Sequence, residues 1–176
     1  MLRAKTALFI LAGMMMLASC KKDSEVQSPE SPDASTKNVN AAPDVWRKAN
    51  LTNFESYPAP GSEECSPDGY NGCLWAGQFA FLNGVQPLSW VKSHDIASIH
   101  SKDAGKYKLK TLRIRQGAKQ LDVKVYDECA DSDCHGCCTI NANENGIGFL
   151  IDIEKFTMQR FGTGDGVVEW KCLDCG

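Results

Sequence analysis

The sequence predicts a mainly β fold, a small closed barrel with one or two short helices. Several short runs of alternating apolar and polar residues are separated by turn residues, as is typical of β-strands. No heptad pattern is present, and a helical pattern occurs only near the C-terminus, before a last strand. The 176 residues, of which 43% are hydrophobic, suffice for one domain with a buried core.

Four candidate strands precede the helical segment. Leu74–Phe81 ends at the turn dipeptide Asn83-Gly84, and Ile96–His100 follows it. Leu112–Arg115 and Leu121–Tyr126 form a predicted hairpin around residues 116–118. The last of these strands alternates strictly, so one face is buried; its inward residues are Leu121, Val123 and Val125.

The C-terminal part supplies two more strands and the helix. Phe149–Ile151 is a short apolar strand, and Asp152 stands where a helix N-cap is expected. The apolar residues of the helix, Ile153, Phe156 and Phe161, precede Gly162, which suits a helix end. Val167–Cys172 is the predicted last strand.

The N-terminus predicts export and lipid anchoring. Arg3 and Lys5 precede an apolar stretch, residues 7–17, that is too short to span a bilayer. The following Leu-Ala-Ser-Cys resembles the lipobox of bacterial lipoproteins, which implies that Cys20 is lipidated. We therefore expect a bacterial cell-envelope lipoprotein of the outer membrane, on either face. Residues 1–19 are the signal peptide, 20–44 a flexible tether, 45–64 an extended lead-in and 65–176 the barrel domain.

The remaining cysteines are even in number, which favours four disulfides in an exported protein. These eight are Cys65, Cys73, Cys129, Cys134, Cys137, Cys138, Cys172 and Cys175. Two C-x-x-C motifs leave a structural zinc site as an alternative, and a calcium site at Asp127, Asp131 and Asp133 lacks the EF-hand glycine and glutamate. We predict no metal and no cofactor. The formal net charge of −3 also argues against a nucleic-acid partner.

Three segments resemble one known family. VKVYDEC from Val123, LIDIEKFTMQRFG from Leu150 and GVVEWKCLDC from Gly166 are similar to the double-psi β-barrel of expansins, rare lipoprotein A, barwin and kiwellin-type proteins. The likeness runs from about Cys65 to the C-terminus and implies a six-stranded, disulfide-stapled double-psi barrel. Asp152, Phe161, Gly162 and Trp170 fall in register with the family pattern. The family's Asp-Leu-Ser turn is replaced here by Asp152, Ile153 and Glu154.

The resemblance makes Asp152 a candidate acid/base residue in a sugar-binding groove, whereas the residues alone favour an N-cap. Glycoside hydrolysis normally needs a second carboxyl group. Asp127 is a weaker candidate, because it is in phase with the inward-facing Val123 and Val125. Glu154 is a candidate ligand-binding residue.

Aromatic side chains are the other candidates for sugar contact, because flat rings can stack on pyranose rings. Trp75, Trp90 and Tyr126 are the predicted platforms, and Trp170 is expected in the core. No nucleophile elbow, phosphate loop or H-E-x-x-H motif is present.

Three functions follow from these observations. The first is binding of a polysaccharide, either peptidoglycan or an external glucan, in an expansin-like groove without efficient hydrolysis. The second is cleavage by Asp152, as a lytic transglycosylase or glycoside hydrolase. The third is a protein-binding or inhibitor module for a secreted protein, as in barwin-like and kiwellin-like barrels.

Overall fold

Six strands close into one barrel in the computed structural model, which describes residues 45–66 and 70–175. Around the barrel the order is β1-β5-β2-β4-β3-β6. The strands are β1 (Arg47–Phe54), β2 (Ile96–His100), β3 (Thr111–Gln116), β4 (Lys119–Cys129), β5 (Leu150–Glu154) and β6 (Gly166–Cys172). The predicted six-stranded barrel is confirmed. Cys20, the signal peptide and the tether lie outside the described residues.

The strand pairing repeats itself within the barrel. β1 is parallel to β5 and β2 is parallel to β4, whereas all other neighbours are antiparallel. If β1, β2 and β3 are exchanged with β4, β5 and β6 respectively, every neighbouring pair of strands and its direction stay the same. Each parallel pair joins strands far apart in the sequence, so the connections must cross the barrel. This internal two-fold relation is the interlocked arrangement of a double-psi barrel.

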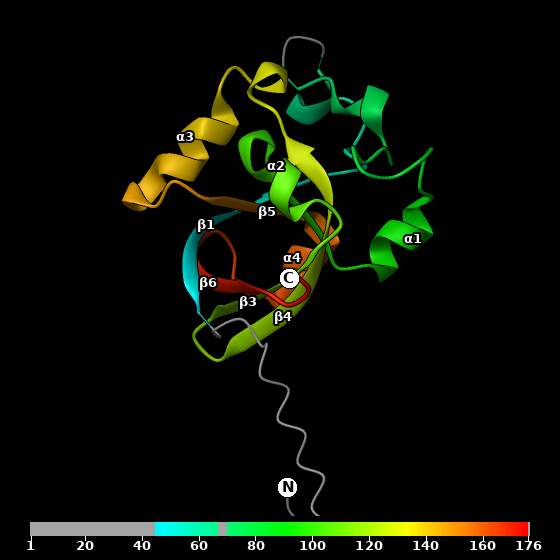
Figure 1. Ribbon diagram of the computed structural model, residues 1–176. Coiled ribbons are helices and arrows are strands. Elements are labelled where there is room, and N and C mark those ends of the chain that lie inside the picture. The colour runs from blue at the N-terminus through cyan, green and yellow to red at the C-terminus, as the bar shows by residue number, and fades with distance from the viewer. Residues whose placement is uncertain (1–44, 67–69, 176) are drawn as a thin grey trace, which may run out of the picture. The chain divides into compact units, whose positions relative to one another are not determined.

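The helices are short and lie on the outside of the barrel (Figure 1). The described residues contain four α-helices rather than the predicted one or two: α1 (Leu88–Ser93), α2 (Ser101–Tyr107), α3 (Cys137–Asn143) and α4 (Lys155–Phe161). Short 3-10 turns are η1 (Glu63–Cys65), η2 (Gly72–Trp75), η3 (Asp131–Asp133) and η4 (Glu144–Gly146). Six or seven residues per α-helix are too few for a clear helical period in the sequence. Within the described part, no helix has the length and apolarity to cross a bilayer.

The barrel interior is the main hydrophobic core. Alternate residues of every strand point into it, including Leu51, Ile99, Ile114, Val125 and Ile153, all at most 1% exposed. Trp170 is 1% exposed in the same cluster, which confirms its assignment to the core. Two smaller clusters lie on other elements, one at α1 and one at α3.

The first barrel strand lies outside the segment that the sequence assigned to the barrel. Residues 45–64 are predicted as a lead-in, but β1 (Arg47–Phe54) lies between β5 and β6. The barrel therefore begins at Arg47 rather than Cys65. The prediction of a strand at Leu74–Phe81 is wrong, because this segment forms η2 and turns. Its apolar side chains are largely outside the barrel core, and Trp75 is 62% exposed.

The eight cysteines of the described region pair as four disulfides, as predicted. The pairs are Cys65–Cys73, Cys129–Cys138, Cys134–Cys137 and Cys172–Cys175. All four close short loops, so each covalent link fixes local geometry more than it restricts the unfolded chain.

Candidate functional site

Four neighbouring strands bring a row of polar side chains together on the outer face of the barrel. Asp152 of β5 is paired with Thr52 of β1 on one side and with Ser98 of β2 on the other. Ser98 is in turn paired with Asp127 of β4. The residues flanking Asp152, Ile151 and Ile153, point into the core, so Asp152 points outward.

A β-bulge turns Asp127 toward the same face. The register between β2 and β4 shifts here: Ala97 pairs with Val125, whereas Ser98 pairs with Asp127. Tyr126 is the extra residue, so the simple alternation along β4 ends at this point. Asp127, predicted in phase with the inward-facing Val125, lies instead beside Asp152 on the outside. This shift assembles the two-carboxyl site.

Asp152 is not the helix cap that its position in the sequence indicates. It lies within β5, and its carboxylate Oδ1 accepts a hydrogen bond of 2.8 Å from Thr52 Oγ1. Burial is the main cause that raises the pKa of Asp152 to about 7; the Thr52 hydrogen bond opposes this rise, and the nearby carboxylates of Asp127 and Asp165 contribute to it. A substantial fraction of Asp152 is therefore protonated at neutral pH and can donate a proton.

Asp127 has a different set of partners. Its Oδ1 accepts a hydrogen bond of 2.8 Å from the backbone N–H of Ala80, so the segment after η2 covers this carboxylate. Burial raises the pKa of Asp127 to about 6, and the Glu128 and Asp133 carboxylates act in the same direction. The backbone hydrogen bonds from Ala80 and Glu128 partly offset this rise. Asp127 is therefore mainly ionised at pH 7, whereas Asp152 is about half protonated.

Glu154 is the helix cap. Its side chain accepts hydrogen bonds from the Phe156 backbone N–H, at 2.6 Å, and from Ser56 Oγ, at 3.0 Å. Burial raises its pKa, and these hydrogen bonds oppose the rise. Because Glu154 is 1% exposed, we assign it a structural role in place of the predicted ligand contact.

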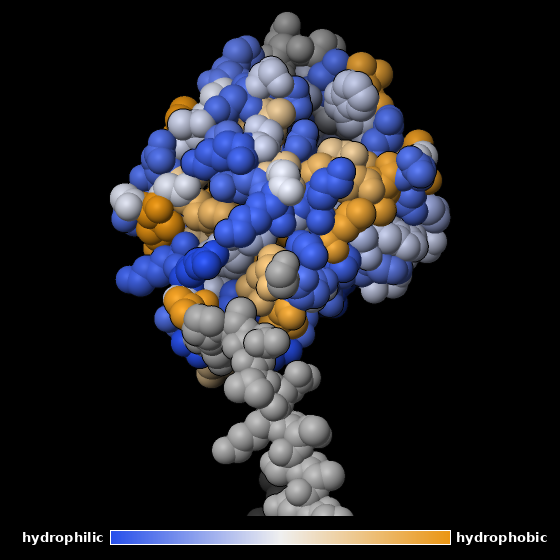
Figure 2. Space-filling model, in the orientation of Figure 1, coloured by the Kyte–Doolittle hydropathy of each residue, from blue (hydrophilic) through white to orange (hydrophobic). Residues whose placement is uncertain are grey.

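Asp152 and Asp127 line an open groove of about 530 Å³. Four other carboxylates also line it, and no lysine or arginine is among its lining residues within the described chain. The polar lining residues are Thr52, Asn53, Glu55, Glu64, Tyr70, Ser98, Asp127, Glu128, Asp133, Asn141 and Asp152. The groove therefore suits neutral hydroxyl-rich ligands or cations and disfavours phosphates. The face drawn in Figure 2 is mainly hydrophilic, with small hydrophobic patches.

The predicted aromatic platforms divide into two groups. Trp90 stacks on His94, with ring centroids 4.0 Å apart, and also contacts Tyr126 in the cluster near α1. We assign these two rings to packing. Trp75 is 62% exposed on η2, whose first residue, Gly72, lines the groove. Tyr70, which the sequence analysis did not single out, is 50% exposed and lines the groove directly.

The cysteines of the two C-x-x-C motifs, which left a zinc site as an alternative, form disulfides. Cys129, Cys134, Cys137 and Cys138 have all their sulfurs within 4.8 Å of one another, but they form two disulfides. Cys172 and Cys175 also form a disulfide, beside Asp174. The three aspartates of the alternative calcium site are also used differently. Asp127 and Asp133 line the groove, whereas Asp131 accepts hydrogen bonds from Thr139.

A comparison with protein-family models finds no match, and neither does a comparison with the sequences of curated proteins. Several solved structures are similar. They include an expansin of Clavibacter michiganensis (13% identity, 75% of this chain, TM-score 0.39), of which the chain spans about half, 52%. The endoglucanase EG27II of family GH45 has 13% identity over 73% of this chain and 82% of its own, with a TM-score of 0.43. The β-1,4-D-endoglucanase Cel45A of the blue mussel Mytilus edulis has 12% identity over 75% and 81%, with a TM-score of 0.42.

Proposed function

We propose that the protein binds a polysaccharide in the acidic groove and that Asp152 and Asp127 act as an acid/base pair on a glycosidic bond. One observation carries this proposal: two carboxyl groups in the same groove have pKa values raised to about 7 and about 6. Perturbed carboxyl groups in an open groove are typical of catalytic acids and bases.

The two residues have complementary roles. Asp152 in its neutral form donates a proton to the leaving glycosidic oxygen. Asp127 in its ionised form accepts a proton from the attacking group, either water or a hydroxyl of the sugar itself. Thr52 donates a hydrogen bond to one oxygen of Asp152, and within residues 45–66 and 70–175 no hydrogen bond is found to the other oxygen, which is the one we assign to the ligand. The raised pKa values of the two groups favour this combination of a neutral Asp152 and an ionised Asp127 near neutral pH.

The groove also has features that suit a glycan chain. Tyr70 is an exposed ring in the lining and Trp75 is an exposed ring on the adjacent turn, and both can stack on sugar rings. Amide and hydroxyl side chains such as Asn53 and Asn141 can bond sugar hydroxyls. We further propose, from the N-terminal sequence, that a lipid on Cys20 holds this groove at the cell envelope.

The test uses insoluble peptidoglycan and cellulose as the two substrates. Wild-type protein should be retained on one of them and should release soluble sugar products, measured as reducing ends or muropeptides. Asp152→Asn should abolish release and keep binding, and Tyr70→Ala should weaken binding. Asp122→Asn is the matched control, because Asp122 pairs with Arg113 on the β3–β4 hairpin and does not line the groove.

The outcomes separate the candidate functions. Retention that depends on Tyr70 without any release would leave a binding protein and overturn the acid/base roles. If wild type neither binds nor cleaves either polymer, the carbohydrate proposal is wrong. Capture of a secreted protein in place of both polymers would favour an inhibitor or partner-binding module.

A further inference from the structure

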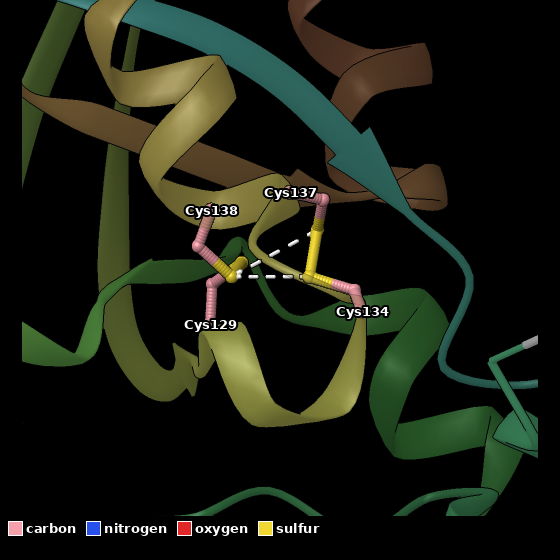
Figure 3. Close-up of side chains that lie close together, drawn as sticks. All are labelled: Cys129, Cys134, Cys137 and Cys138. Carbon is pink, nitrogen blue, oxygen red and sulfur yellow. Dashed lines mark hydrogen bonds between the residues drawn. A yellow bond between two sulfur atoms is a disulfide. The ribbon is translucent and has the colours of Figure 1, made fainter.

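Two disulfides lie in contact beside the groove (Figure 3). Cys134–Cys137 and Cys129–Cys138 have their sulfurs close together: Cys134 Sγ is 3.5 Å and Cys137 Sγ is 3.9 Å from Cys138 Sγ. Figure 3 shows the four side chains converging from the end of β4, the following turn and the start of α3. None of the three predicted functions uses this pair.

We propose that the pair is a thiol–disulfide exchange site, in which a dithiol reduces Cys134–Cys137 and the freed Cys134 thiolate then attacks the buried sulfur of Cys138 in the Cys129–Cys138 disulfide. In the first step the dithiol is oxidised to its disulfide, and Cys134 and Cys137 take its two electrons and two protons. In the second step the Cys134–Cys138 bond forms and the Cys129–Cys138 bond breaks. The electron pair leaves on Cys129, which takes up a proton.

The exposure of the sulfurs favours Cys134–Cys137 as the disulfide that the external dithiol attacks first. Cys134 and Cys137 both line the groove and are partly exposed, whereas in the second disulfide Cys129 also lines the groove but Cys138 is 0% exposed. The two residues between them also have left-handed backbones, with φ of 53° at His135 and 89° at Gly136. Such a conformation costs free energy at a residue other than glycine, and opening the disulfide lets His135 relax.

The surrounding structure holds the sulfurs in place after the first bond opens. Asp131 accepts hydrogen bonds from the backbone N–H and the hydroxyl of Thr139, at 2.9 and 2.6 Å, which tie the turn to α3. Cys138 packs with Ala142 and Leu150, and Cys129 is the last residue of β4, paired with His100 of β2. The freed Cys134 therefore remains close to Cys138, and a high local concentration favours exchange.

The charge of the groove restricts the partner. The cysteines share the groove with the carboxylates of Asp127, Glu128 and Asp133, so anionic thiols are repelled. We expect a neutral dithiol to react faster than an anionic thiol such as glutathione. Exchange frees Cys129, two residues after Asp127, so the redox state would also alter one wall of the groove.

The experiment traps the second step directly. Cys137→Ser leaves Cys134 as a free thiol next to the intact disulfide. After incubation at pH 8, acid quenching, alkylation and peptide mass mapping, the alkyl group should be found on both Cys134 and Cys129, with a Cys134–Cys138 peptide present. Label on Cys134 alone would overturn the proposal. Cys175→Ser is the matched control: among the described residues the freed Cys172 has no other disulfide close to it, so its label should stay on Cys172.

A second arm uses the wild-type chain, in case the variant does not fold. One equivalent of dithiothreitol followed by the same trapping should label Cys129 and Cys137 and yield the Cys134–Cys138 peptide. Label confined to Cys134 and Cys137 would show that electrons stop at the outer disulfide, and label only at Cys65, Cys73, Cys172 and Cys175 would show that they never enter; either result contradicts the proposal. Rates with dithiothreitol and with glutathione test the charge argument.

Discussion

Replacing Asp152 with asparagine should stabilise the protein at alkaline pH. The pKa of Asp152 rises from its usual value of 3.8 to about 7 on folding, mainly through burial. Between these values the folded state keeps a proton that the unfolded chain has released, so the free energy of unfolding falls as pH rises. The rise in pKa corresponds to about 4 kcal/mol once the pH exceeds 7. Asparagine avoids this loss because its amide does not ionise.

The assay is urea unfolding followed by tryptophan fluorescence at pH 4, 6 and 8, with the disulfides intact. Asp152→Asn should gain little relative to wild type at pH 4 and up to about 4 kcal/mol at pH 8, an upper bound because relaxation and water entry reduce desolvation. The Thr52 hydrogen bond is compatible with an amide oxygen, which keeps the two side chains matched in shape.

Asp122→Asn is the control of opposite sign. Hydrogen bonds of 2.6 and 2.7 Å from Arg113 lower the pKa of Asp122, so this carboxylate stabilises the fold at pH 8 and its replacement should destabilise it. If wild type and Asp152→Asn show the same dependence of stability on pH, Asp152 is not desolvated, and the reasoning for its acid role is refuted.

Three further predictions follow from the same geometry. The rate of glycan cleavage should be bell-shaped in pH, with a maximum between about 6 and about 7, and Asp127→Asn should remove the acidic limb; a flat profile would contradict the pair. Thr52→Val removes the hydrogen bond that lowers the pKa of Asp152, so the alkaline limb should move to higher pH; an unchanged limb would show that this bond is unimportant. Trp170→Ala should lower the free energy of unfolding by about 3–5 kcal/mol in urea titrations, because the ring is 1% exposed in the barrel core; a loss below 1 kcal/mol would contradict this placement.

Much of the barrel could be predicted from local patterns. The hairpin of β3 and β4 alternates clearly and turns at Gly117, whose φ of 58° favours glycine. β2 and β6 were also predicted, as was the buried Trp170. In these segments the local sequence alone, through its alternation of apolar and polar residues, is enough to indicate a strand.

The sequence analysis did not predict β1, because this strand is stabilised by pairing with strands that are far away in the sequence. Within Arg47–Phe54 only Ala49 and Leu51 point into the barrel core. The strand pairs with β5, 100 residues further along the chain, and with β6, 115 to 123 residues further along. The opposite error occurs at Leu74–Phe81. Its apolar residues fit a strand pattern, but the six strands of the barrel already pair with one another in a closed ring, so no strand edge is left for it to pair with. Hydrophobicity alone gives the wrong first strand.

The candidate site was only partly predictable, for a related reason. Both carboxyl groups were named as candidates, but the helix-cap role that was the alternative for Asp152 belongs to Glu154, two residues later. Both residues can cap a helix. The decisive factor is that β1 and β2 pair with β5 on both sides, and β1 remains paired as far as Glu154, so the helix cannot begin earlier.

The position of Asp127 could not be predicted from strict alternation along β4. The free-energy cost of burying an unpaired carboxylate could have indicated that the alternation breaks. The two-residue period places Asp127 with Val123 and Val125, which are 0% exposed inside the barrel. An unpaired carboxylate among such residues costs several kcal/mol, so the alternation must break before Asp127 or the group must find partners. The structure does both: Tyr126 is the extra residue of a bulge, and Ala80 donates a hydrogen bond to the displaced carboxylate. An acidic residue in phase with a buried apolar face near a strand end therefore predicts a bulge, and here the bulge places the second carboxyl group beside Asp152.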